Sequence, residues 1–129
     1  MTVEDLVANI EKEKPEWDKI CGEGGLAEQF ARELKNTKST QIRKFFNSIK
    51  TIERKFKSGT WDEDKAKAEL WHTVPQAKYA EQRKLCNYEF YKFIHDSVKT
   101  VTNSTDDEFA RRLNTFCKIF ESVVAYAHK

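Results

Sequence analysis

The sequence predicts an all-α protein, a compact bundle of about five to six helices. Apolar residues recur at spacings of three and four along most of the chain, which is typical of helices with one buried face. Only four glycines and two prolines occur among the 129 residues, so few turns are expected and long helices are favoured over many short strands. This length, with 39% hydrophobic residues, fits a single helical domain covering residues 1–129.

The first 25 residues form a segment of distinct composition, with seven acidic residues against three lysines. Thr2 begins a short amphipathic helix, which Pro15 is expected to end. Gly22, Gly24 and Gly25 then mark a flexible joint. This acidic segment could be a mobile arm or could pack loosely on the bundle.

Two helices follow the glycines. The first covers residues 26–34, and a turn leads to a long helix over residues 39–57 that Ser58 and Gly59 end. Ser39 or Thr40 is expected to accept a hydrogen bond from the free amides of the long helix.

The second half of the chain contains further helix-start signals. Thr60 and Glu63 match a capping box and start a helix running to about residue 71 or 72. Pro75 suits the first position of another helix, because its missing N–H would be unbonded there in any case. Asn87 is expected to cap the next helix, and a second capping box at Thr105 precedes the last one.

The long helix over residues 39–57 separates apolar from basic residues. Its apolar stripe follows i, i+3, i+4, i+7, i+10 and i+14, with the residues Ile42, Phe45, Phe46, Ile49, Ile52 and Phe56. A polar stripe with the same period consists of Arg43, Asn47, Lys50, Arg54 and Lys57, with Lys44, Thr51 and Lys55 beside it. The segment has six basic residues and one acid, a net charge of +5 in a chain of net charge +2. Such a stripe is suited to binding a polyanion through its phosphates, and a solvated helix face is the alternative interpretation.

Positive charge collects at a second place, the segment that follows Pro75. It holds Lys78, Arg83 and Lys84 against the single acid Glu81. With the long helix, this segment gives two candidate regions for contact with an anionic partner.

No grouping of residues predicts catalysis, a metal site or a cofactor. The histidines lie on three different expected helices and form no His-x-x-x-His pair, so a helix-borne zinc site is not expected. The three widely spaced cysteines, Cys21, Cys86 and Cys117, fit a reducing compartment and no disulfide framework. No apolar run approaches the roughly 20 residues that span a bilayer, and the acidic start is not a signal peptide. We expect a soluble cytoplasmic protein that is not an enzyme and does not contact a membrane.

Three stretches together resemble one family, the small subunit of the type III-A (Csm) CRISPR effector complex. The stretch from Thr40 to Phe45, Thr-Gln-Ile-Arg-Lys-Phe, is similar to the Ser-Gln-Ile-Arg-Lys-Phe signature of that family. Its Pro-…-Tyr-Ala-…-Arg segment is matched at the same spacing by Pro75, Tyr79, Ala80 and Arg83. The end of the chain, Phe-Glu-Ser-Val-Val-Ala-Tyr-Ala-His-Lys over residues 120–129, resembles the close of the family. The resemblance covers the chain from about Leu26 onward, and the acidic first 25 residues have no counterpart.

The resemblance implies an all-α subunit without catalytic activity, a component of CRISPR antiviral defence. By the same resemblance, several copies are expected to line the inner side of a helical ribonucleoprotein and to pack against the backbone subunits that hold the guide RNA. The subunit is then expected to line the channel in which target RNA pairs with that guide. The residues expected to contact the RNA backbone, without reading sequence, are Gln41, Arg43, Lys44, Lys50, Arg54, Lys78 and Arg83.

Two other functions remain open from the sequence. A helical protein–protein adaptor could use the same basic face to bind an acidic partner. A helix-turn-helix DNA-binding protein could use the turn at residues 36–39 and the basic helix after it to read base edges.

Overall fold

The computed structural model describes residues 2–105 and 107–127, and within them all regular structure is helical. The seven helices are α1 (Thr2–Glu11), α2 (Trp17–Cys21), α3 (Leu26–Glu33), α4 (Ser39–Lys57), α5 (Glu63–Gln82), α6 (Tyr88–Thr102) and α7 (Phe109–Ala127). The prediction of an all-α bundle is confirmed.

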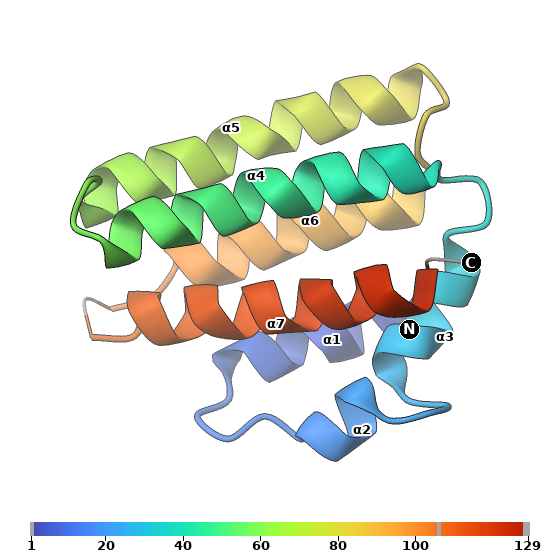
Figure 1. Cartoon of the computed structure of the whole chain (residues 1–129), viewed down its shortest axis with the longest axis horizontal. Coiled ribbons are helices and arrows are strands. Elements are labelled where there is room, and N and C mark those ends of the chain that lie inside the picture. Colours follow the sequence, from blue (N-terminus) through green and yellow to red (C-terminus); the bar gives the residue numbers. More distant parts are fainter. Residues whose placement is uncertain (1, 106, 128–129) are drawn as a thin grey trace.

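The helices are arranged so that α4 has a neighbour on each side. Figure 1 shows α5, α4 and α7 side by side, with α6 behind α4 and with α1, α2 and α3 gathered beside α7. Because α4 and α5 run antiparallel, the start of α4 lies beside the end of α5. There the backbone N–H of Lys38 donates a hydrogen bond to the carbonyl of Leu85 at 3.2 Å. One face of α4 therefore remains directed outward.

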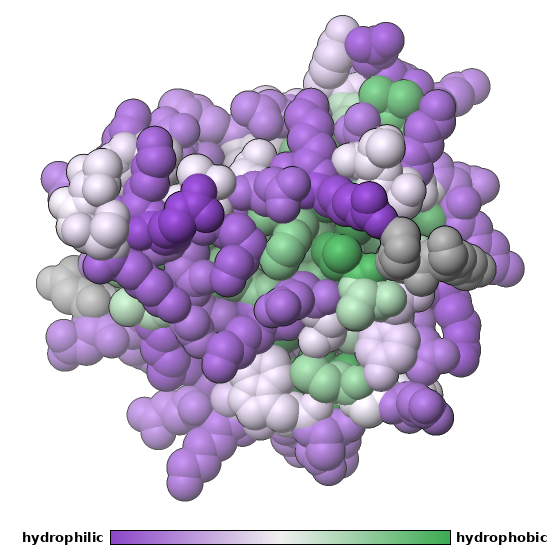
Figure 2. Space-filling model, viewed as in Figure 1, coloured by the Kyte–Doolittle hydropathy of each residue, from purple (hydrophilic) through white to green (hydrophobic). Residues whose placement is uncertain are grey.

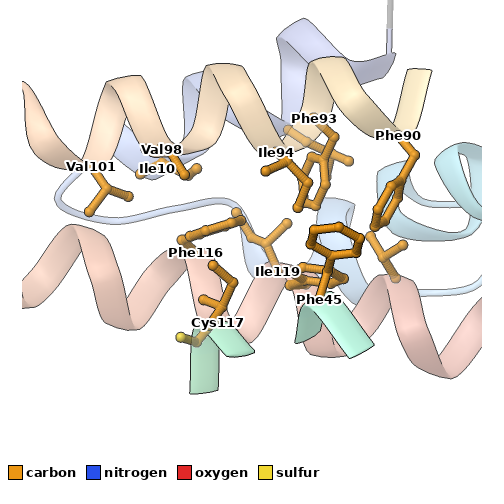
Figure 3. Packing of buried hydrophobic residues seen from close by; sticks show 14 of the residues in the cluster. Ile10, Phe45, Phe90, Phe93, Ile94, Val98, Val101, Phe116, Cys117 and Ile119 are labelled. Carbon is orange, nitrogen blue, oxygen red and sulfur yellow. The ribbon is translucent and has the colours of Figure 1, made fainter. Parts of the chain in front are cut away.

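Phenylalanine rings fill the centre of the bundle. Figure 3 shows Phe45 of α4, Phe90 and Phe93 of α6, and Phe116 of α7 pointing toward one another. The ring centroids of Phe93 and Phe120 are 5.4 Å apart, and those of Phe45 and Phe90 are 5.6 Å apart. Each of these side chains is at most 1% exposed, and burying a side chain of this size stabilises the fold by about 1.5–3 kcal/mol.

The acidic N-terminal segment contributes to this core. Val3, Leu6 and Ile10 of α1 are at most 1% exposed, and α1 packs against α3, α6 and α7. Its other face carries the acidic residues, of which Glu4 forms an ion pair with Lys92 of α6. The structure therefore places α1 as an integral packed helix of the bundle.

The expectation that Pro75 begins a new helix is wrong, because α5 continues through it from Glu63 to Gln82. A proline inside a helix removes one backbone hydrogen bond and costs about 3 kcal/mol. Leu70 before the proline and Ala77 after it are both fully buried in the same core. Their packing offsets the missing hydrogen bond and keeps the two halves of α5 in one helix.

The sequence predicts the N-cap of α6 correctly but not the N-cap of α5. Thr60 was expected to cap α5, but Asp62 is the N-cap, and its carboxylate accepts a hydrogen bond from the Lys65 backbone N–H at 2.8 Å. Asn87 caps α6 as predicted and accepts from the backbone N–H of Phe90 at 3.1 Å. Both caps satisfy amides that have no partner within the helix.

The start of α4 lacks the side-chain cap that was expected from Ser39 or Thr40. Ser39 is already the first residue of the helix, and Lys38 is its N-cap without a side-chain hydrogen bond. The backbone N–H groups of Gln41 and Ile42 donate to the carbonyl of Lys38 at 2.9 and 3.2 Å. No acidic residue lies in this first turn, so the positive end of the helix dipole is not balanced by a local carboxylate.

Candidate nucleic-acid interface

The basic stripe of α4 lies on the outward face of the helix. Ile42, Phe45, Ile49 and Ile52 point into the core, and each is at most 4% exposed. At 100° per residue the stripe residues fall within about 80° of one another, on a different side of the helix. Four of them are exposed and one, Lys50, is half-buried: Arg43, Asn47, Lys50, Arg54 and Lys57. The fold thus presents the predicted stripe as one surface between α5 and α7.

Figure 2 shows the face formed by α5, α4 and α7, on which hydrophilic residues predominate. An apolar strip is visible between α4 and α7 in the same view. Phe46 of α4 and Val124 of α7 are among the half-buried hydrophobic residues of these helices. The basic surface is therefore bordered on its α7 side by apolar side chains.

Part of the positive charge on α4 is already paired within the chain. The carboxylate of Glu53 lies 3.2 Å from the ammonium of Lys50 and 3.3 Å from that of Lys57. Arg54 is turned away from this carboxylate, and its guanidinium donates to the Thr51 hydroxyl at 3.4 Å. One acid is thus shared by two lysines of the stripe, and the net charge of α4 stays strongly positive.

Sequence reasoning did not assign a role to Glu53, although it is the single acid among six basic residues. Its position three residues after Lys50 and four before Lys57 was the available signal, because such spacings bring side chains together on a helix. The partner on α7, Asn114, donates to Glu53 at 3.1 Å and could not be foreseen from spacing.

The other predicted contacts of α4 lie toward α5. Lys44 is exposed and Gln41 is half-buried, both at the end of α4 that adjoins the end of α5. The ammonium of Lys55 lies over the ring of Trp61, 4.8 Å from its centroid. These residues broaden the basic surface on the side of α4 opposite to Glu53.

The cationic side chains of the second basic segment, which follows Pro75, point in two different directions. Arg83 is exposed, with its guanidinium 5.5 Å from the ring centroid of Tyr79. Lys78 instead lies over the ring of Tyr91 of α6 at 5.1 Å and pairs with Glu81 at 3.3 Å. Arg83 therefore lies at the end of α5 that adjoins the start of α4, whereas Lys78 is directed toward α6.

Nothing in the described part of the chain groups side chains for metal binding. Burial raises the pKa of the Cys86 thiol to about 11, with a further contribution from Glu81. Burial also raises the pKa of the Cys117 thiol, and the nearby charge of Glu53 adds to the effect. Both thiols stay protonated at neutral pH and are therefore poor nucleophiles. Among residues 2–105 and 107–127, no helix is long and apolar enough to cross a bilayer.

These features define a small all-α protein whose main chemical feature is a basic face on one helix. Residues 24–129 match the family Csm2 Type III-A, and the chain belongs to this family. The family is the small subunit of the type III-A CRISPR complex, which confirms the resemblance seen in the sequence. Membership implies association with other Csm subunits. The matched range begins just before α3, so α1 and α2 lie outside it. Searches of curated proteins and of solved structures found no significant match.

Proposed function

We propose that this subunit binds the phosphate backbone of RNA through the outward face of α4, without reading sequence. The observation that carries the proposal is the basic stripe, which the fold exposes as one surface between α5 and α7. Arginine and lysine that meet phosphates release condensed counterions, and such contacts position a nucleic acid without specifying its bases. In an RNA-guided complex the sequence is read by base pairing, so a backbone-binding subunit is sufficient.

The proposed contacts are centred on Arg43, Lys44 and Arg54, with Lys50 and Arg83 at the margins of the surface. Gln41, at the same end of α4, is proposed to donate a hydrogen bond to sugar or phosphate. Lys78 is not included, because its ammonium lies over Tyr91 on the α6 side of the bundle.

The proposed partners are the guide RNA and the target RNA, the backbone subunits of the Csm complex, and other copies of the same chain. The net charge of only +2 limits the affinity of one isolated copy for RNA. Several copies in one assembly raise the effective affinity, because each further contact is then intramolecular. No catalytic step is assigned to this subunit.

The test is a salt titration of RNA binding by the wild type and two charge-matched variants. Arg43→Glu/Arg54→Glu alters the α4 face, and Lys14→Glu/Lys99→Glu makes the same change in net charge on exposed residues elsewhere. When four of the five proposed cations contact phosphates of single-stranded RNA, log affinity against log salt falls with a slope of about −3. The α4 variant should flatten the slope to about −1.5 for two unrelated RNA sequences alike, and the control should change it far less.

Equal loss of affinity in both variants would show that only net charge matters and would refute an interface on α4. Circular dichroism before each titration checks that both variants remain helical. Tighter binding to a specific duplex DNA than to RNA would instead favour the helix-turn-helix interpretation. RNA binding by the wild type that is no tighter than binding by the α4 variant would favour a protein–protein adaptor.

A further inference from the structure

Glu53 is the feature of α4 that the proposed function leaves unexplained. It is the only acid in the helix, yet it is 3% exposed and lies against α7. Lys50 donates to one carboxylate oxygen at 3.2 Å. Asn114 of α7 and Lys57 lie 3.1 and 3.3 Å from the other oxygen. The carboxylate is therefore anchored to α7 by one neutral donor while it neutralises two cations of the stripe.

The chemistry of this cluster keeps Glu53 ionised. Burial alone raises the pKa of its carboxyl group, but the hydrogen bonds from Lys50 and Lys57 outweigh burial, so the pKa lies below its ordinary value. The pKa of Lys50 is raised in return, chiefly by its hydrogen bond to Glu53. A fixed negative charge therefore stands among the cations at neutral pH.

The cluster also borders a surface hollow of about 450 Å³. The hollow is lined by Lys50, Glu53, Arg54, Lys57 and Ser58. It is large enough for a phosphate group, and three of its five lining residues are cations. A phosphate that entered it would meet the same two ammonium groups that Glu53 now holds.

We propose that Glu53 is a built-in competitor of RNA phosphates for Lys50 and Lys57. By occupying both lysines, it lowers the affinity of the α4 face for RNA and the salt dependence of that binding. Because Asn114 ties the carboxylate to α7, the carboxylate stays in place when RNA approaches. Arg54, which is not paired with Glu53, makes its phosphate contact without this competition. This inference rests on the proposed RNA-binding function and concerns how strongly the same face binds.

The first experiment replaces Glu53 with glutamine, which has the same shape and can still accept a hydrogen bond from Asn114. Glu28→Gln is the matched control, because Glu28 forms an i,i+4 pair with Arg32 on α3, away from the stripe. In salt titrations with a fluorescein-labelled single-stranded RNA, Glu53→Gln should bind about three to ten times more tightly at 0.1 M salt. Its slope should be steeper by about 0.7 to 1.4, as one or two more lysines contact phosphates. The control should match the wild type.

A second comparison has a first arm that keeps Glu53 in place, so this arm does not depend on how the glutamine variant folds. In the wild-type background, Arg54→Gln should weaken RNA binding more than Lys57→Gln, because Lys57 is already neutralised. In the Glu53→Gln background, Lys57→Gln should lose affinity by a clearly larger factor than in the wild type. Such a change of effect measures the coupling of the two residues directly.

An unchanged slope for Glu53→Gln would overturn the inference. So would weaker binding with a shallower slope, which would mean that Glu53 orients the lysines toward RNA. Equal losses from Lys57→Gln and Arg54→Gln in the wild-type background would also overturn it. Failure of the RNA-binding proposal itself is a separate result, because it appears in the wild type and in Arg43→Glu/Arg54→Glu.

Discussion

Replacing Leu6 with alanine tests whether the acidic N-terminal segment is part of the folded core. Leu6 lies on α1 and is fully buried. The change removes three carbon atoms, which costs about 2.4 kcal/mol at about 0.8 kcal/mol per buried methylene. A cavity that does not collapse raises the cost toward about 5 kcal/mol. We therefore expect Leu6→Ala to lower the free energy of unfolding by about 2.5–5 kcal/mol.

Urea unfolding followed by circular dichroism measures this change. With a denaturant slope of about 1–3 kcal/mol per molar, the midpoint should fall by at least about 0.8 M. Glu11→Ala is the control on the same helix, since Glu11 is exposed, and it should change stability by less than about 0.5 kcal/mol. A loss below about 0.5 kcal/mol for Leu6→Ala would refute the packing of α1, because a detached arm loses nothing when its leucine is shortened.

Three further predictions concern single sites. Ser97→Ala should stabilise the protein by about 0.5–2 kcal/mol in urea unfolding, because the buried Ser97 hydroxyl has no hydrogen-bond partner in the described part of the chain; a loss of stability would contradict this. Asn87→Ala should lower the free energy of unfolding, measured by thermal denaturation, by about 1–2 kcal/mol through loss of the α6 cap. Asn87→Ser, which can still cap, should recover much of this loss. At pH 8 a thiol reagent should modify the exposed Cys21 quickly and modify Cys86 and Cys117 only on unfolding, since burial and raised pKa values protect both. Rapid reaction of all three thiols would show that the core opens readily.

The sequence was sufficient to predict the orientation of α4. Ile42, Ile49 and Ile52 recur at helical spacing, and a helix buries its apolar stripe wherever the rest of the bundle lies. The opposite face must then contain Arg43 and Arg54, whichever helices flank it. Properties that depend on one period along one helix can be predicted without the tertiary structure.

The course of α5 could not be predicted in this way. Pro75 is a strong local signal for a break, and local rules place a helix start there. The break is overridden because Leu70 and Ala77 pack in one core, and that packing is a property of three helices together. A local backbone preference of a few kcal/mol is overridden when the free energy gained by burying side chains on both sides of the residue is larger.

The charge balance of the candidate interface also depended on the fold. Spacing along α4 suggests that Glu53 meets Lys50 and Lys57, but not that the carboxylate is buried against α7. Asn114, 61 residues further along the chain, provides that anchor. The direction of Lys78 toward Tyr91 is likewise set by the packing of α5 on α6. The number of cations counted from the sequence is therefore larger than the number that a phosphate can contact.

The packing of α1 has a consequence for how the chain is made. During translation α1 leaves the ribosome before α6 and α7, which pack against its apolar side. Glu4 and Lys92, which pair across α1 and α6, are 88 residues apart. At about 5–20 residues per second, the first helix waits for about 4–18 seconds before its docking surface exists. Its surplus of carboxylates is expected to repel other nascent chains during that interval, which would limit aggregation until the bundle closes.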